Sequence, residues 1–279
     1  MANVLITGCS SGFGLLTALE FARKGDRVCA TMRNMAKAGE LEQARDAEKL
    51  SIEVLQLDLL DEGSITKAVA EAEKAGPIDV LVNNAGWELR SPIETALEDE
   101  VRAQFETNVF GTLRVTRAVL PKMRARRAGT IVNLSSIGGV VSVPYGGYYA
   151  ASKHALEAIS EAMHYELHSF GVRVIVIEPG GFPTGFSSNV AVSKTFTPDS
   201  PYFDLNERFD AKLRQMMAPG GVPQDPADVA RTIYDAVHDV SPKLRYLVGA
   251  DANMIASVRK QLDFEAFEGA MRNAMDWRD

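Results

Sequence analysis

The sequence predicts an α/β protein with a doubly wound parallel sheet of about seven strands and helices on both faces. Short β-branched runs alternate with longer amphipathic segments along the 279 residues. Strand and helix alternating at this spacing favour right-handed crossovers, which place all strands parallel in one sheet. The alternation crosses the middle of the chain without a linker. We therefore expect a single domain over residues 1–279, although length alone suggests two.

The expected strands are short and lie at regular intervals along the chain. They cover residues 4–6, 27–31, 52–57, 80–82, 130–134, 172–177 and 245–248. A helix through residues 15–21 follows the first strand. Further helices are expected near residues 35–48, 63–75, 98–125 and 149–169.

One segment breaks this alternation and is expected to form a lid over a functional site, at about residues 182–225. It is rich in proline and glycine, and its aromatic residues argue against disorder. Within it, residues 204–217 can form a short amphipathic helix. A C-terminal helical extension is expected at about residues 251–279. Its apolar anchors are Leu262, Phe264, Phe267 and Trp277.

Bulk properties argue against several classes of function. A net charge of −7 does not suggest a nucleic-acid partner. No apolar run reaches the ~18 residues of a membrane span, and the N-terminus lacks a signal peptide, so we expect a cytoplasmic protein with no membrane partner. Cys9 and Cys29 have no acidic or histidine neighbour in the sequence and are interpreted as packing residues. His164 and His168 lack a third ligand, so no metal site is expected.

A glycine-rich turn links the first strand to the first helix. Its sequence is Thr7-Gly8-Cys9-Ser10-Ser11-Gly12-Phe13-Gly14. Glycine permits a positive φ in a tight turn and lets the backbone approach a ligand that a Cβ would exclude. The following helix presents free N–H groups and a positive dipole end to an anion. In this setting the turn predicts a Rossmann-type dinucleotide site that binds the diphosphate.

The ends of the next strands complete the expected dinucleotide site, because ligands lie at the carboxyl ends of an open parallel sheet. Asp58 follows the third strand and can accept a hydrogen bond from an adenine amino group, and residues 83–86 follow the fourth strand. The second strand ends without the acid that selects NAD. Arg33 can pair there with a 2′-phosphate, and Ser10 or Ser11 can add a hydroxyl. We therefore expect NADP(H), with NAD(H) as the alternative.

Tyr149 and Lys153 begin a long helix four residues apart, so they lie on one helical face. A free phenol has a pKa of about 10. A neighbouring ammonium favours the phenolate. The pair is thus expected to act in general acid/base catalysis. Tyr148 is five residues from Lys153 and is expected to point elsewhere.

Several motifs occur in order between residue 3 and about residue 184. They are Thr-Gly-x-x-x-Gly-x-Gly at 7–14, Asn-Asn-Ala-Gly at 83–86, Asn108, Ser135-Ser136, Tyr-x-x-x-Lys at 149–153 and Pro-Gly at 179–180. In these motifs the chain resembles the short-chain dehydrogenase/reductase family. Cys-Ser-Ser-Gly-Phe-Gly at 9–14 together with Ala-Thr-Met-Arg-Asn at 30–34 is similar to its hydroxysteroid and retinol dehydrogenase-like subgroup.

The resemblance implies a role for each site residue. Tyr149 would be the general acid/base, Lys153 would hold the nicotinamide ribose and lower the pKa of the phenol, and Ser136 would hydrogen-bond the substrate oxygen. Asn108 would bind a water that links Lys153 to solvent, and Thr184 would contact the nicotinamide carboxamide. The implied cofactor-binding residues are Gly8, Ser10, Ser11, Gly12, Phe13, Gly14, Arg33, Asp58, Leu59, Asn84, Ala85, Gly86, Tyr149, Lys153, Pro179, Gly180 and Thr184.

The resemblance also implies a reaction, the interconversion of an alcohol and a ketone or aldehyde by hydride transfer. The aromatic lid favours a bulky lipophilic substrate. Expected substrate contacts are Ser136, Ile137, Tyr145, Tyr149 and Phe186, with Trp87, Val143 and Phe182 as further pocket candidates. A homodimer or homotetramer through residues 98–125 and 149–169 is also implied. The alternative function is a non-catalytic dinucleotide sensor on the same fold.

Overall fold

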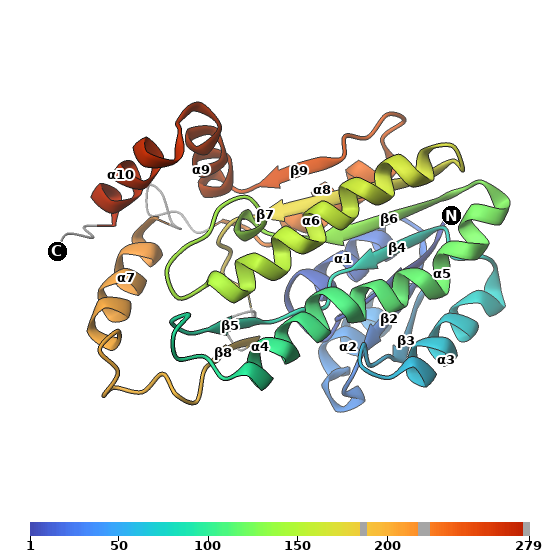
Figure 1. Cartoon of the computed structure of the whole chain (residues 1–279). Helices are drawn as coiled ribbons and strands as arrows, with labels where there is room; N and C mark the ends of the chain where they lie inside the picture. The colour runs from blue at the N-terminus through green and yellow to red at the C-terminus, as the bar shows by residue number, and fades with distance from the viewer. Residues whose placement is uncertain (185–188, 217–223, 276–279) are drawn as a thin grey trace.

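The computed structural model describes residues 1–184, 189–216 and 224–275. At its centre lies a seven-stranded parallel sheet with the order β3-β2-β1-β4-β6-β7-β9 (Figure 1). The strands are β1 (Asn3–Ile6), β2 (Arg27–Met32), β3 (Ile52–Gln56), β4 (Val80–Asn83), β6 (Gly129–Leu134), β7 (Val172–Pro179) and β9 (Arg245–Val248). The predicted doubly wound parallel sheet is therefore confirmed. The strand order reverses between β1 and β4, which is where such sheets bind ligands.

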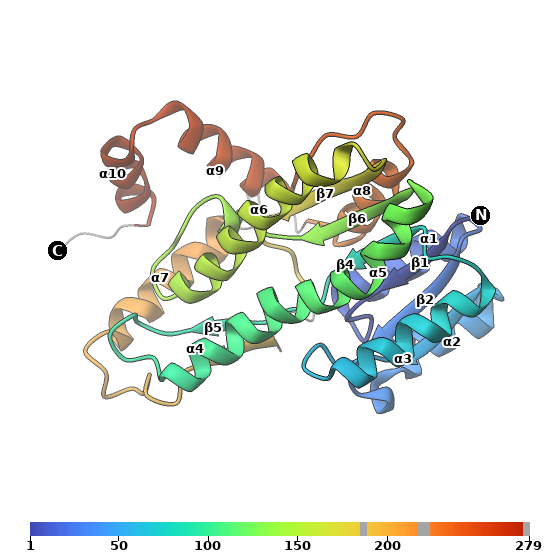
Figure 2. The ribbon, with the colours of Figure 1, turned by 45° about the vertical axis from the view of Figure 1, so that its right-hand side comes forward.

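Helices cover both faces of the sheet because side chains alternate along each strand. In β1, Val4 and Ile6 pack in one apolar core, and Leu5 packs in the other. Figure 2 shows α5 and α6 on the near side of the sheet. The first core is closed by α1 (Gly12–Arg23), α2 (Gly39–Glu48) and α8 (Ala227–His238), and the second by α3 (Glu62–Ala72), α5 (Thr112–Arg126) and α6 (Gly147–His168).

Two of the helical regions expected from the sequence contain an irregularity in the structure. The helix expected over residues 98–125 consists of α4 (Glu98–Phe105), a π-helical turn (Glu106–Gly111) and α5. The expected C-terminal helix consists of α9 (Ala250–Gln261) and α10 (Phe264–Ala274), and its predicted anchor Trp277 lies outside the described residues. The helical region predicted over residues 98–125 is therefore confirmed, and its π-helical turn was not predicted. The C-terminal extension is helical as expected, but it forms two helices instead of one.

The predicted lid contains a short strand and a helix. β8 (Val190–Val192) pairs in parallel with β5 (Glu88–Arg90), which follows β4. Each of these strands has three residues, which is too short for a period-of-two pattern to show in the sequence. α7 (Phe203–Met216) matches the amphipathic helix expected in this region.

A third apolar cluster joins the lid to the C-terminal extension. Its buried members are Tyr145, Phe196, Phe209 and Met275. Phe196 and Phe209 come from the lid segment, and Met275 directly follows α10. As a result α7, α9 and α10 gather beyond the carboxyl ends of the strands, far from the N-terminus (Figure 1).

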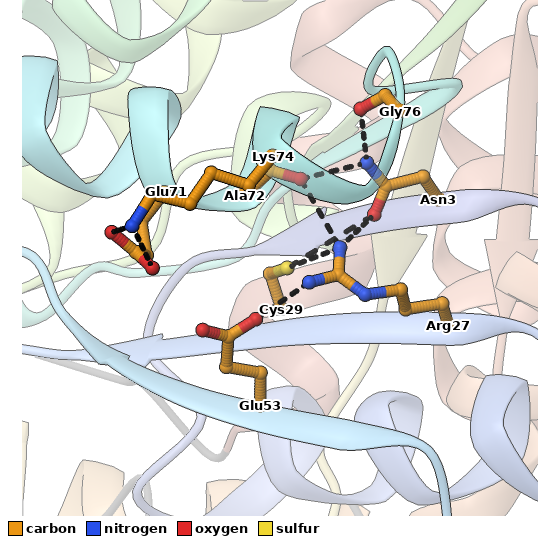
Figure 3. Close-up of polar contacts among 8 residues, drawn as sticks. All are labelled: Asn3, Arg27, Cys29, Glu53, Glu71, Ala72, Lys74 and Gly76. Carbon is orange, nitrogen blue, oxygen red and sulfur yellow. Dashed lines mark hydrogen bonds and ion pairs between the residues drawn. The ribbon is translucent and has the colours of Figure 1, made fainter.

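A polar cluster joins the amino ends of β1, β2 and β3 (Figure 3). The Asn3 amide nitrogen donates to the carbonyl oxygens of Ala72 (2.9 Å) and Gly76 (2.8 Å). The Asn3 amide oxygen accepts from Arg27 Nη1 (3.0 Å), and Arg27 Nη2 pairs with Glu53 Oε2 (2.6 Å). Both polar atoms of the buried Asn3 amide therefore have partners, as buried polar groups in stable proteins do.

Candidate active site

A cleft of about 680 Å³ opens at the carboxyl ends of the strands and extends from the glycine-rich turn to the C-terminal helices. It is lined by these predicted site residues: Gly8, Ser10, Ser11, Gly12, Phe13, Arg33, Asp58, Leu59, Asn84, Ala85, Gly86, Ser136, Ile137, Tyr149, Lys153, Pro179, Gly180 and Thr184. Gly14, Asn108 and Tyr145 are not among its described lining residues. Phe186 lies outside the described residues.

The glycine-rich turn is held close to the loop that follows β4. Gly8 has a φ of +75°, a left-handed conformation that glycine adopts without strain. A Cβ on Gly14 would lie 2.4 Å from both the Gly8 carbonyl oxygen and Asn84 Nδ2, so a side chain is excluded at that position. Asn84 Nδ2 donates to the carbonyl oxygens of Thr7 (2.8 Å) and Gly8 (3.1 Å). The Asn84 side chain therefore fixes the shape of the turn.

The first turn of α1 fits a diphosphate group. Ser11 is the N-cap, and within the described part of the chain its side chain makes no capping hydrogen bond. Residues 12–14 carry no acidic side chain that would repel an anion. N–H groups at a helix N-terminus and the helix dipole favour an anion. A close backbone approach that excludes a Cβ and an uncapped helix end together support a dinucleotide at this site.

The adenosine end of the expected dinucleotide site contains Arg33 and Asp58, which both line the cleft. The main chain of Arg33 is tied to β3, because its carbonyl oxygen accepts from Gln56 Nε2 (3.3 Å). The exposed Arg33 side chain remains at the cleft. Asp58 Oδ1 accepts from Leu60 N (3.0 Å), so one carboxylate oxygen holds its own loop.

Tyr149, Lys153 and Ser136 meet where β6 ends and α6 begins. The Ser136 hydroxyl is hydrogen-bonded to the Tyr149 phenol and accepts from Gly138 N (3.0 Å). Lys153 Nζ donates to the Leu134 carbonyl oxygen (2.7 Å) and lies 5.6 Å from the centroid of the Tyr149 ring. The predicted helical spacing thus places the ammonium beside the phenol.

Burial has the largest effect on the charges of this pair. It lowers the pKa of the Lys153 ammonium to about 8, and the Glu157 carboxylate partly opposes this effect. Burial also raises the pKa of the Tyr149 phenol, the Glu88 carboxylate raises it further, and the hydrogen bond with Ser136 lowers it. Lys153 is not among the groups that change the pKa of the phenol in the chain on its own, so the lowering expected from it is not seen.

Asn108 lies in the π-helical turn between α4 and α5, behind the cleft. Its Oδ1 accepts from Trp87 N (3.1 Å), and its Nδ2 donates to the Trp87 carbonyl oxygen (2.9 Å) and to Ser152 Oγ (3.1 Å). The side chain therefore clamps the chain after β4 to α6. π-Helical turns inside helices are often found at functional sites. The expected link between Asn108, a water and Lys153 stays a prediction.

The loop after β7 is fastened to α9 by two residues that the sequence patterns did not reveal. Asp251 Oδ2 accepts from Gly181 N (2.7 Å), and Asp251 Oδ1 accepts from Gln224 Nε2 (2.8 Å). A Cβ on Gly180 would lie 2.1 Å from Asp251 Oδ1. In the sequence, Asp251 resembles an ordinary acidic residue in the first turn of a helix, so nothing marks its buried role.

The start of the lid packs on the glycine-rich turn. The rings of Phe13 and Phe182 meet edge to face, with centroids 5.5 Å apart. A Cβ on Gly12 would lie 3.7 Å from Thr184 Cβ. Thr184 is therefore close to the phosphate end of the cleft as well as to the loop after β7.

The other half of the cleft, which we call the substrate half, has an apolar wall. It includes Trp87, Ile137, Val141, Val143, Phe182, Leu213, Ile255, Met271 and Met275. The sequence predicted Trp87, Ile137, Val143 and Phe182 but not the residues from α7, α9 and the α10 region. Tyr145 supports the wall from behind, since its ring stacks on Phe196 with centroids 5.7 Å apart. Its φ of +63° marks backbone strain near the site.

The two cysteines of the chain are both buried. Burial raises the pKa of Cys9 to about 12 and that of Cys29 to about 11, so both buried thiols act as packing residues. Over residues 1–184, 189–216 and 224–275, no group of three or more His, Cys, Asp or Glu residues is arranged to hold a metal. None of the helices in these ranges has the length and apolar character needed to span a membrane.

Known proteins are similar to this chain in sequence and in fold. The family model for short chain dehydrogenase matches residues 2–194. The 3-ketodihydrosphingosine reductase of Bacteroides thetaiotaomicron is 40% identical over 203 residues, which are 72% of this chain and 71% of that protein. Human 17-beta-hydroxysteroid dehydrogenase type 1 is 37% identical over 252 residues, which are 87% and 76% of the two chains. The structure of an actinorhodin polyketide ketoreductase variant with NADPH is 28% identical, has a TM-score of 0.77 and covers 90% and 97% of the chains.

Proposed function

Because this chain belongs to the short-chain dehydrogenase family, we propose that it interconverts a secondary alcohol and a ketone, with Tyr149 as the general acid/base and NADP(H) as the preferred cofactor. The relatives identify it as an NAD(P)-dependent oxidoreductase of the hydroxysteroid and retinol dehydrogenase-like type. The observation that carries the proposed chemistry is the Tyr149 phenol, hydrogen-bonded to Ser136, beside the Lys153 ammonium. These groups share one cleft with the glycine-rich turn.

The side chains divide the work of the reaction. The dinucleotide, when bound, supplies or accepts the hydride. In reduction, the protonated Tyr149 phenol donates its proton to the substrate oxygen, and its raised pKa keeps that proton available at neutral pH. Ser136 holds the phenol and the substrate oxygen in position. Lys153, anchored on the Leu134 carbonyl oxygen, supplies a positive charge to the cofactor ribose and to the phenolate formed in each turnover.

The preference for NADP(H) rests on the end of β2. Arg33 lines the cleft there, and residues 30–34 contain no acid to repel a 2′-phosphate. Arginine forms bidentate, charge-assisted hydrogen bonds with phosphate. The similar ketoreductase structure holds NADPH, which is consistent with the same choice.

The apolar wall of the substrate half supports a bulky lipophilic substrate. Two relatives are named for a hydroxysteroid and for ketodihydrosphingosine, which fits such a substrate. We also propose a homo-oligomer that uses the outer faces of α4, α5 and α6. Phe110 and Tyr165 are 50% and 72% exposed on this side of the molecule, and large exposed apolar side chains favour association.

Replacing Tyr149 by Phe tests the proposal and has a matched control in the adjacent tyrosine. Tyr148 is half-buried and donates to the Ile93 carbonyl oxygen, away from the acid/base pair. NADPH oxidation is measured with a panel of ketones of graded size. We expect Tyr149→Phe to lower kcat/KM by at least about 1000-fold, because proton donation is lost. Tyr148→Phe should keep wild-type turnover.

Cofactor titrations complete this experiment. NADPH should bind the wild type more tightly than NADH, and Tyr149→Phe should bind NADPH nearly as the wild type does. Full turnover in Tyr149→Phe would contradict the assigned acid/base. Dinucleotide binding without turnover of any ketone by the wild type would favour the sensor instead.

A further inference from the structure

The substrate half of the cleft contains charged groups within its largely apolar lining. Glu88 and Arg90 both line the cleft, and both come from β5. Residues two apart on a strand share a face, whereas Leu89 between them points away and is buried. Neither charge was predicted from the sequence, because β5 is too short to show an alternating pattern.

Asp210, which lies in the lid, already neutralises the charge of Arg90. Arg90 Nη1 pairs closely with Asp210 of α7, whereas Arg90 Nη2 lies 3.4 Å from Glu88 Oε1, at the limit of a hydrogen bond. Two carboxylates thus face one guanidinium, and the group carries a net charge of −1. The partial, long contact leaves Glu88 as the less compensated of the two acids.

Glu88 is poorly solvated as well as poorly paired. Its side chain is 15% exposed, and burial raises the pKa of its carboxyl group although Arg90 opposes the shift. A buried carboxylate is costly unless a cation or hydrogen-bond donors compensate its charge. A ligand that brings a positive charge to Glu88 would therefore be favoured over a neutral ligand of the same shape.

Glu88 also lies close to the reacting centre. Its carboxylate raises the pKa of the Tyr149 phenol, so the two groups interact electrostatically. Glu88 Oε1 lies 4.0 Å from the Cβ position of Gly146, three residues before Tyr149 at the start of α6. A cation bound to Glu88 would therefore lie near the start of α6, which also carries the Tyr149 phenol.

We propose that Glu88 is a specificity-determining residue, which selects lipophilic ketones and alcohols that carry an ammonium group a few bonds from the reacting oxygen. This inference rests on the proposed function, because it describes the substrate of the same cleft. An anionic substrate is disfavoured, since Arg90 is held by Asp210. A purely apolar substrate would leave the Glu88 charge with only its long contact to Arg90 in a largely apolar part of the cleft.

The test compares two ketones of nearly equal shape. In 3-(dimethylamino)propiophenone, a protonated nitrogen replaces the branched carbon of 4-methylvalerophenone. We expect the wild type to prefer the amine in kcat/KM, and Glu88→Gln to reduce that preference by about tenfold, which corresponds to one lost charge pair of roughly 1.4 kcal/mol. Intrinsic reactivity of the two carbonyls cancels, because only the change in the ratio is used.

Two further variants sharpen the test. Asp210→Asn should also lower the preference for the amine, because Arg90 is then free to pair with Glu88. Glu98→Gln removes the same charge from an exposed site on α4, where the side chain is 77% exposed, and should leave the ratio unchanged. An amine preference that is equal in wild type and Glu88→Gln would overturn the inference.

Binding measurements separate this inference from the proposed reaction. The affinity of both ketones for the NADP⁺ complex is measured by ligand-induced thermal stabilisation. Tighter binding of the amine that depends on Glu88 supports the inference even without turnover. Absence of turnover with NADPH bound would count against the reaction alone. Turnover of both ketones with no Glu88-dependent difference would count against the inference alone.

Discussion

The two ends of the central sheet differ in how completely their polar groups are hydrogen-bonded. At the amino ends, Asn3, Arg27 and Glu53 form a connected cluster across three strands (Figure 3). The Asn3 backbone N–H also donates to Asp79 Oδ2 (2.9 Å). Such satisfied buried networks fix the register of a sheet and stabilise it. Even at this end, Asp26 Oδ2, directly before β2, is buried without a hydrogen-bond partner among the described residues.

At the carboxyl ends, several groups remain imperfectly paired. Ser135 Oγ and Glu157 Oε1 are buried without a hydrogen-bond partner among the described residues. Lys153 is buried with a lowered pKa, and Glu178 is buried beside Glu157 with a raised one. Active sites commonly hold groups in states that cost stability. Most polar groups at the amino ends of this sheet are therefore arranged for stability, whereas those at the carboxyl ends are arranged for binding and chemistry.

The largest effect on stability is expected at the amino ends. Asn3→Ala removes the amide that joins Ala72, Gly76 and Arg27. The Gly76 carbonyl oxygen then loses this donor, and the Ala72 carbonyl oxygen keeps only Arg27 Nη1 (3.1 Å). We expect the free energy of unfolding to fall by about 3 kcal/mol. Urea unfolding measures this change, and KM for NADPH should stay the same. Asn273→Ala, on an exposed position of α10, is the control; a matching loss there would contradict the role of the cluster.

A smaller effect on stability with a larger effect on binding is expected at the glycine-rich turn. In Gly14→Ala, the new Cβ would lie 2.4 Å from the Gly8 carbonyl oxygen and from Asn84 Nδ2, so the turn must shift. Overpacking of this kind costs about 1–3 kcal/mol. We expect NADPH affinity to fall by at least about tenfold. Gly39→Ala is the control, because nothing lies within 4 Å of its Cβ position. Unchanged NADPH affinity in Gly14→Ala would show that the close approach does not shape the site.

The smallest effect on stability is expected from Glu178, which lies beside Glu157 behind the cleft. Burial and the Glu157 carboxylate raise the pKa of Glu178 from 4.5 to about 7, while Arg245 opposes the shift. The folded state therefore favours protonated Glu178. That stabilisation is complete below pH 4.5 and is lost as the pH rises through about 7.

Glu178→Gln should remove this part of the pH dependence. As the pH rises from 5 to 8, we expect the free energy of unfolding of the variant to increase by on the order of 2 kcal/mol relative to that of the wild type. Unfolding by urea at several pH values measures the difference. Glu161, which also pairs with Arg245, supplies the control variant Glu161→Gln, because its side chain is 47% exposed. A constant difference between Glu178→Gln and the wild type across this pH range would disprove the assignment.

The repeated alternation of strands and helices predicted the parallel sheet with helices on both faces, but not the order of its strands. The local sequence was sufficient to predict that Gly8, Tyr149, Lys153 and Ser136 lie at the cleft. Each belongs to a short motif at a fixed place next to a strand or helix. Elements whose form depends on distant contacts were missed. β5 exists because β8 pairs with it from a segment about a hundred residues away, and no local pattern carries that information.

The sequence by itself determined the sheet, the glycine-rich turn and the placement of Lys153 beside Tyr149, since hydrophobic period, glycine and helical spacing act over a few residues. Tertiary structure decided the rest of the site. It brought Asp251 to the loop after β7, and it placed the lid and α10 around Tyr145. It also set Glu88 and Arg90 into the cleft opposite Asp210. Burial and pairing of charges depend on which elements distant in sequence come into contact, and only the folded chain determines those contacts.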